Sequence, residues 1–346
     1  MSRKISWVAI LAMALMVLFT VSCEGPAGAD GADGADGADG ADGMDANAFC
    51  VDCHSSDNWD KITGEYAVSG HATAGALNYA GGRGSCSRCH SSEGFEGYLL
   101  GYPGEDLTQK SALSCESCHG NHSSLEEDVS APMASVAPIG LILDETTIID
   151  FGDASNLCAN CHNSRRDGTY YEALDSVSID GVMTAVGDGM VGINSSHAGP
   201  HYSAQVNTIM GLNGYGTSSV GTHKNVGCVG CHMGEATDTN GGHTFEPNLA
   251  NCTEACHTSV ADIEAFAAEK HDAVSARMTA IADALVAAGA LSEEDGHYSP
   301  KVSIVSQDVF EAFWNYRIMY QDHSYGVHNP GYYNTMLTTA EAKLGL

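Results

Sequence analysis

Basic residues are scarce in this chain of 346 residues. Lysine and arginine together number 14, against 44 aspartates and glutamates, so the formal net charge is −30 at pH 7. Such a body repels nucleic acid and anionic lipid surfaces, because their charges have the same sign. We therefore expect no nucleic-acid partner, whereas cationic proteins, metal ions and positively charged mineral surfaces fit the charge. A surface charged for solubility alone is the alternative.

Cysteines free to form disulfides are also lacking. Twelve of the 13 cysteines stand in six short motifs, numbered 1 to 6 in chain order, and Cys23 lies outside them. In each motif a histidine directly follows the second cysteine. The motifs comprise Cys50, Cys53 and His54 (motif 1); Cys86, Cys89 and His90 (motif 2); Cys115, Cys118 and His119 (motif 3); Cys158, Cys161 and His162 (motif 4); Cys228, Cys231 and His232 (motif 5); and Cys252, Cys256 and His257 (motif 6).

A single C-x-x-C motif would leave three interpretations open: a zinc site, a redox dithiol or a covalent haem. Histidine makes up 16 of 346 residues, so its presence after all six second cysteines by chance has a probability on the order of 10⁻⁸. The sequence therefore predicts six haem c groups, each joined to two cysteine sulfurs by thioether bonds. Motif 6 is one residue wider, which alters how its two sulfurs meet the haem.

Long apolar runs are rare as well, and the one near the start, Ile5–Val21, follows Arg3 and Lys4. This layout is typical of a secretory signal. Thr20–Cys23 resembles a bacterial lipobox, although leucine usually stands where Thr20 does, and it predicts lipidation of Cys23. Export fits haem attachment, because 12 cysteines in an oxidising compartment need an occupant other than disulfides. Cleavage after Ser22 without a lipid, and an uncleaved anchor of marginal length, stay open.

We expect three segments: residues 1–22 are a lipoprotein-type signal peptide, 23–44 a tether of Gly-Ala-Asp repeats, and 45–346 the hexahaem cytochrome domain. Glycine recurs at every third position from Gly25 to Gly43, as in collagen, but Pro26 is the single proline there. We interpret this segment as a solvated acidic tether with a span of roughly 25 Å. A short trimerising triple helix is the alternative.

Sustained apolar periodicity is missing from residues 46–251, where glycine, asparagine, serine and aspartate interrupt the chain. With roughly 50 residues for each haem, the haems themselves would form the core. The predicted fold class is a multihaem cytochrome c, mostly irregular coil with short helices wrapped around a haem chain. Residues 260–346 differ, because helical periodicity predicts helices over Val260–Leu285, Val309–Tyr320 and Tyr332–Leu344. These helices form a lid on the last haems, or else an independent hairpin domain.

Each motif histidine is held beneath its haem once both sulfurs are attached, and so becomes the proximal iron ligand. The proximal set is His54, His90, His119, His162, His232 and His257. Ten further histidines suffice for a second histidine on every iron, and methionine is an alternative ligand that would raise the reduction potential. His122 lies three residues after His119, on the same side of that haem, so its natural target is a neighbouring haem.

Several stretches resemble multihaem c-type cytochromes of metal-respiring bacteria, including six-haem filament-forming members. They are "SGHATAGALNYAGGRGSCSRCHSSEGF", "CESCHGNH", "GPHYSAQVNTIMGLNGY", "CVGCHM" followed by "GGHTF", and "DHSYGVHNPGYYNTML". The resemblance implies distal iron ligands at His71, His122, His201, His223, His243 and His328, with His197 as a competitor of His201. By contrast, His271 lies on the predicted buried stripe of its helix, and His297 and His323 are predicted loop residues.

Three functions follow from these patterns. The first is electron conduction through bis-histidine low-spin haems, from a periplasmic or outer-membrane donor to a metal oxide, a metal ion or a partner cytochrome, without enzymatic activity. The second is a nitrite, hydroxylamine or tetrathionate reductase with one open haem, although all six motifs end in histidine and none has the lysine that often marks such a haem. The third is a subunit of a self-assembled filament. The lipid anchor and tether favour an outer-membrane or cell-surface lipoprotein, or an extracellular location.

Overall fold

A computed structural model of the chain describes residues 55–102, 104–120, 133–233, 242–255, 257 and 259–346. Chain contacts separate Met1–Asp45 from Ala46–Leu346, and all the described residues belong to the second unit. The predicted signal peptide, tether and lipidated Cys23 lie outside the described residues. Within the described part, no helix combines the length and the apolar character needed to cross a membrane.

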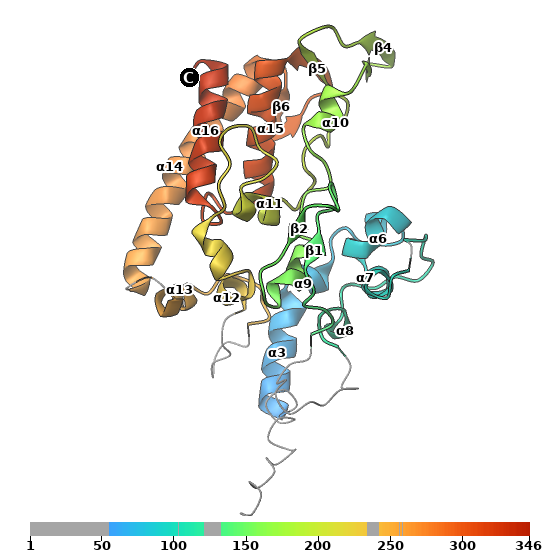
Figure 1. The fold of residues 1–346 in the computed structure, drawn as a ribbon, viewed down its shortest axis with the longest axis vertical. Helices are drawn as coiled ribbons and strands as arrows, with labels where there is room; N and C mark the ends of the chain where they lie inside the picture. The colour runs from blue at the N-terminus through green and yellow to red at the C-terminus, as the bar shows by residue number, and fades with distance from the viewer. Residues whose placement is uncertain (1–54, 103, 121–132, 234–241, 256, 258) are drawn as a thin grey trace, which may run out of the picture. The chain divides into compact units, whose positions relative to one another are not determined.

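Short helices dominate the first part of the chain (Figure 1), and several of them contain residues of the cysteine motifs. A 3₁₀ turn, Thr222–Asn225, precedes motif 5. The helices are α3 (Ser56–Val68), α4 (Gly70–Thr73), α5 (Leu77–Ala80), α6 (Gly84–His90), α7 (Ser92–Leu99), α8 (Cys115–Cys118), α9 (Ser155–Ala159), α10 (Thr169–Glu172), α11 (Gln205–Met210), α12 (Val229–His232) and α13 (Leu249–Ala255).

Eight short strands, which the sequence did not indicate, form four two-stranded antiparallel sheets in the described part of the chain. Most are local pairs, but β5 pairs with β8 across more than a hundred residues, with Val191 opposite Val305. This pair ties the middle of the chain to its C-terminal part. The strands are β1 (Ile139–Gly140), β2 (Ile148–Ile149), β3 (Ser176–Ile179), β4 (Val182–Ala185), β5 (Met190–Ile193), β6 (Leu291–Glu294), β7 (His297–Pro300) and β8 (Ser303–Ser306).

The three predicted C-terminal helices are confirmed as α14 (Val260–Ala287), α15 (Gln307–Asp322) and α16 (Pro330–Leu344). The Ser259 side chain accepts a hydrogen bond from the Asp262 N–H at the start of α14, as the capping pattern predicted. Helix α16 begins at Pro330 itself rather than after it, because proline needs no N–H donor in a first turn and Asn329 caps the helix.

These helices form a conventional apolar core, which the expectation of a haem-filled interior did not include. Phe310, Phe313 and Trp314 of α15 are fully buried against Tyr332 and Tyr333 of α16. The core continues into the middle of the chain, since β5 and the segment before α11 also contribute to it. The C-terminal part is therefore not an independent hairpin domain but shares one core with residues of the haem-motif region.

Helix α14 is buried only in its second half, from Met278 onward. Earlier residues on its predicted apolar stripe are only half-buried or are exposed, as Phe266 is at 58%. The His271 side chain is 50% exposed, with its ring against Tyr325. The prediction that His271 is a buried core residue is therefore wrong, because α15 and α16 pack only on the C-terminal half of α14.

Candidate haem-binding sites

Each cysteine motif with a described backbone forms a single tight turn. In three of the regular motifs the histidine N–H donates a hydrogen bond to the carbonyl of the first cysteine: His119 to Cys115 at 2.8 Å, His162 to Cys158 at 3.0 Å and His232 to Cys228 at 2.9 Å. This is the α-helical hydrogen bond, and it brings the first cysteine and the histidine to adjacent positions on one turn.

Motif 6 keeps the same end-to-end closure despite its additional residue. The His257 N–H donates to the Cys252 carbonyl at 3.0 Å, across five residues instead of four. A turn of this wider type takes up one inserted residue without displacing the residues at its two ends. The wider spacing is thus compatible with the relation between first cysteine and histidine that the regular motifs have.

Four motif histidines face a second histidine from a distant part of the chain. The ring centroids of His162 and His71 are 6.1 Å apart, as are those of His90 and His201 and those of His119 and His243. The rings of His232 and His328 are 6.4 Å apart. In every pair one ring belongs to a cysteine motif and the other to a histidine that the sequence suggested as a distal ligand.

These separations fit two imidazoles that bind one metal ion from opposite sides. An imidazole nitrogen lies about 2 Å from a bound metal and about 1 Å from its own ring centre, which places the two centres about 6 Å apart. Direct stacking of the rings would bring them closer, since aromatic rings in offset contact have centroids from about 4.5 Å. The residues present therefore fit a haem with two histidine ligands.

Burial favours the neutral form of four of these imidazoles. It lowers the pKa of His162 to about 4, with His71 as a further cause, and lowers the pKa of His201 to about 4, with Arg165 as a further cause. Burial also lowers the pKa of His71 and of His90. The neutral imidazole has the free lone pair that binds iron, so these side chains are ready to act as ligands at neutral pH.

Two of the predicted distal histidines are held in place by helix N-caps, one within its helix and one just before it. His71 is in α4, whose N-cap Ser69 accepts from the N–H of Ala72 at 3.2 Å. His328 precedes Asn329, the N-cap of α16, whose amide donates to the carbonyls of Thr208, Ile209 and Ser219. The second anchor connects the start of α16 to α11, and so holds His328 in place opposite His232.

The structure separates His201 from its competitor His197. His201 faces His90, whereas His197 is exposed and its Nδ1 lies 3.3 Å from the Tyr202 hydroxyl. His201 has φ +84°, an uncommon backbone conformation for a residue with a side chain, immediately after Gly199 and Pro200. Local backbone strain of this kind is typical of functional positions.

Other predicted site residues are not brought together in the described part of the chain. His223 is half-buried, with Nδ1 2.5 Å from the Val327 carbonyl oxygen, and His257 is exposed. His323 follows α15 as its cap with φ +59°, so it lies outside regular structure as predicted. Several predicted residues lie outside the described residues: Cys50, Cys53, His54, His122 and Cys256.

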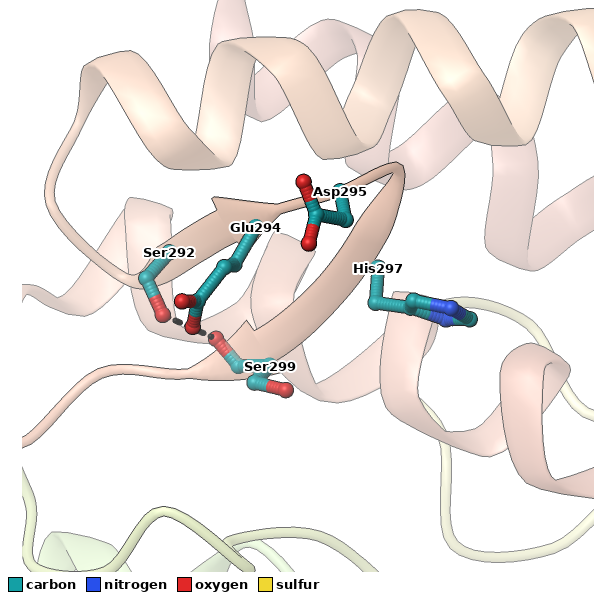
Figure 2. Close-up of a pocket in the computed structure, with 5 residues that line it drawn as sticks. All are labelled: Ser292, Glu294, Asp295, His297 and Ser299. Carbon is teal, nitrogen blue, oxygen red and sulfur yellow. Dashed lines mark hydrogen bonds between the residues drawn. The ribbon is translucent and has the colours of Figure 1, made fainter.

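His297 lies in strand β7, not in a loop as predicted. With Ser292, Glu294, Asp295 and Ser299 it lines a cavity of about 290 Å³ on the β6–β7 hairpin. In Figure 2 the His297 ring points away from Glu294. No cysteine-motif residue lines this cavity, so it is separate from the candidate haem sites.

Cysteines from different motifs lie close together. The thiols of Cys161 (motif 4) and Cys89 (motif 2) are near enough to influence each other's pKa, and so are those of Cys158 (motif 4) and Cys228 (motif 5). Backbone contacts support both junctions. The Arg88 guanidinium donates to the Asn160 carbonyl at 3.2 Å, and the Ser155 hydroxyl accepts from the Cys228 N–H at 2.8 Å.

Three groups that orient ligand histidines were not predicted from the sequence. The His232 Nδ1 is 2.8 Å from the Phe245 carbonyl, and the His162 Nδ1 is 3.3 Å from Gln205 Oε1. The His328 Nδ1 is 2.7 Å from Asp322 Oδ1. Burial lowers the pKa of His328, but the charge and hydrogen bond of Asp322 outweigh it, and the pKa is raised. No spacing rule connects these partners to the motifs, although Asp322 and His328 share one short turn.

Comparisons with known proteins point to one class. A family model described as cytochrome c552 matches residues 214–345, which contain motifs 5 and 6 and the C-terminal helices. The C-type polyheme cytochrome OmcB of two Geobacter sulfurreducens strains is 27% identical over 270 residues, covering 61% of this chain and 34% of the relative. The chain thus spans about a third of the length of these relatives.

The fold also matches a solved structure, the outer cell wall cytochrome OcwA. The TM-score is 0.53 at 20% sequence identity, and the match covers 82% of this chain and 50% of that one. At this identity the likeness concerns the fold alone. It shows that a largely helical chain with little sheet, as described here, is compatible with a multihaem cytochrome.

Proposed function

We propose that this chain, which is similar to multihaem c-type cytochromes, conducts electrons through six covalently bound haems with two histidine ligands each. A bound haem supplies a one-electron redox centre. The two cysteines of each motif would hold the haem, and the motif histidine and its paired histidine would bind the iron. No residue of the chain needs to donate or accept a proton for this function.

The observation that carries the proposal is the set of four histidine pairs at 6.1 to 6.4 Å. When both axial positions are filled by protein side chains, no position is left for a substrate. This arrangement suits electron transfer and opposes catalysis at motifs 2, 3, 4 and 5. A reductase would need an open position at motif 1 or motif 6.

The proximity of the cysteines supports an order for five of the six sites. Motif 4 is central, because its two thiols lie close to those of motifs 2 and 5, and the Cys118 thiol of motif 3 is close enough to act electrostatically on both of them. Motif 5 continues to motif 6 through Cys231 and Cys252 in the same way. We therefore propose a path from motif 2 through motifs 4 and 5 to motif 6, with motif 3 beside motif 4.

The location and partners follow as part of the proposal. The signal-like N-terminus and the name of the outer cell wall cytochrome support export, and lipidation at Cys23 would hold the acidic chain at the outer membrane or cell surface. A net charge of −30 favours a cationic redox protein, a metal ion or a positively charged oxide surface as electron acceptor. Assembly into a filament would place further haems at the ends of this path.

The decisive experiment combines intact-mass spectrometry of the purified protein with electron paramagnetic resonance of its oxidised form. We expect a mass increase of six haems over the processed chain and low-spin signals that account for all six irons. Five haems would place the error at motif 6. A high-spin signal from one iron in the unmodified protein would favour the reductase, with an open position at motif 1 or motif 6.

A further inference from the structure

The proposed distal ligand His328 differs from the motif histidines His232 and His162 in what its Nδ1 contacts. Its Nδ1 lies 2.7 Å from Asp322 Oδ1, and the Asp322 side chain is 0% exposed. By comparison, the Nδ1 atoms of His232 and His162 lie against the neutral Phe245 carbonyl and the neutral Gln205 amide. A carboxylate therefore acts on His328, whereas uncharged groups act on His232 and His162.

Asp322 is held in this position from two sides. Its second carboxylate oxygen accepts a hydrogen bond from the Ser324 hydroxyl. The Ser324 oxygen in turn accepts from the N–H groups of Gly326 and His328, both at 3.3 Å. Asp322 is the last residue of α15, and Gln205 donates to its backbone carbonyl at 3.4 Å. The turn from Asp322 to His328 is thus closed on itself and tied to α11.

The position of this carboxylate makes it a strong hydrogen-bond acceptor. It is excluded from water, and it stands at the C-terminal end of a helix, where the helix dipole adds negative potential. A carboxylate that accepts the Nδ1 proton of a metal-bound imidazole fixes the tautomer and increases the electron donation of the ring. Greater donation and a nearby negative charge both favour ferric over ferrous iron.

We propose that Asp322 is a positioning residue that lowers the reduction potential of the iron held by His232 and His328, and so makes the motif 5 site harder to reduce than it would be without this carboxylate. The proposal rests on the proposed function only in that motif 5 must carry a haem with these two ligands. Asp322, at the C-terminal end of α15, would thus set the reduction potential of the site that lies between motifs 4 and 6 on the proposed path.

The test is a spectroscopic redox titration of three variants of the full-length holoprotein. Asp322→Asn keeps an acceptor oxygen but removes the charge, and we expect one potential to rise while five stay unchanged. A change of about tenfold in the reduction equilibrium constant corresponds to 59 mV for one electron. Ser324→Ala should shift the same potential downward, because the carboxylate loses a competing donor and binds the imidazole more strongly.

Asp308→Asn is the matched control, since it removes the same charge from the exposed start of α15, where Asp308 pairs with Lys343. It should leave all six potentials in place. The proposal is overturned if Asp322→Asn shifts no potential or shifts one downward, or if Asp308→Asn has the same effect. Should Asp322→Asn fail to fold, the absence of a downward shift in Ser324→Ala overturns it equally.

These results remain distinct from a failure of the proposed function. The intact mass of each variant shows whether motif 5 carries its haem, and the low-spin signal shows whether both histidines still bind. A protein with six low-spin haems that passes no electrons to any acceptor would contradict electron conduction and leave the role of Asp322 intact. A missing haem at motif 5 would contradict the proposed function itself.

Discussion

Replacing His201 by alanine tests the histidine pairing most directly. The ring of His201 is 6.1 Å from that of His90, and the two are perpendicular within one degree. Alanine ends at its Cβ, so the substitution removes the whole ligand and opens one axial position on the iron of motif 2. With one histidine left, this iron should change from low spin to high spin, because a single strong axial ligand does not keep the iron low-spin.

The expected magnitude follows from the count of motifs. One of six irons should change, so the low-spin signal should fall by about one sixth while a high-spin signal of the same amount appears. Added imidazole should restore the low-spin state, since the space left by the side chain has the size and shape of the added molecule. Electron paramagnetic resonance with spin quantification measures both changes on the same sample.

His197→Ala is the matched control, four residues earlier in the chain. His197 is exposed and contacts Tyr202 rather than a motif histidine, so its loss should leave all six irons low-spin. The pairing of His201 with His90 would be refuted by an unchanged low-spin signal in His201→Ala. A high-spin iron in His197→Ala would instead identify His197 as the ligand.

Two further predictions concern stability and location. Arg277 donates hydrogen bonds to the two carboxylate oxygens of Glu341 at 2.6 and 2.7 Å, and they lower the pKa of Glu341. The ionised carboxylate therefore stabilises the fold by about 1 kcal/mol above its unfolded pKa of about 4.5. This contribution is lost as the pH falls through the folded pKa. The urea midpoint of Glu341→Gln should therefore be lower than that of the wild-type protein at pH 7 and equal to it at pH 3. Glu269→Gln, which removes one partner of an exposed ion pair, is the control and should match the wild-type midpoint at both pH values. A difference for Glu341→Gln that persists at pH 3 contradicts the ion-pair explanation. If Cys23 is lipidated, Cys23→Ala should move the protein from the membrane to the soluble fraction with an unchanged haem spectrum, and continued membrane association would favour an uncleaved anchor.

The C-terminal helices could be predicted from the sequence because their signals are local. The apolar spacing of α14, its Ser259 cap and the positive φ of Gly289 just beyond its end all lie within a few residues of the helix. What these helices pack against could not be predicted in the same way. Their core includes β5 and Ala204, which lie far away in the sequence, so a lid on the haems was the simplest expectation.

The same distinction explains what was predicted of the candidate sites. The cysteine motifs can be recognised in the sequence because haem attachment requires two cysteines and a histidine within one turn. A distal histidine has no such local requirement, since the fold brings it to the iron from another part of the chain. The family resemblance suggested His71, His201, His243 and His328, but only the structure shows which motif histidine each of them faces.

The order of the paired histidines along the chain has a consequence for how the sites depend on one another. Every paired segment overlaps the next, because each begins before the preceding one has ended: His71 with His162, His90 with His201, His119 with His243, and His232 with His328. Any single break in the chain between His71 and His328 therefore separates the two histidines of at least one pair. Closing such long loops costs conformational entropy, but this cost rises only slowly with loop length, so pairing distant histidines costs little more than pairing nearby ones. We therefore expect the haem-motif region and the C-terminal helices to fold as one unit. The six cysteine motifs, considered one by one, would instead suggest six independent modules.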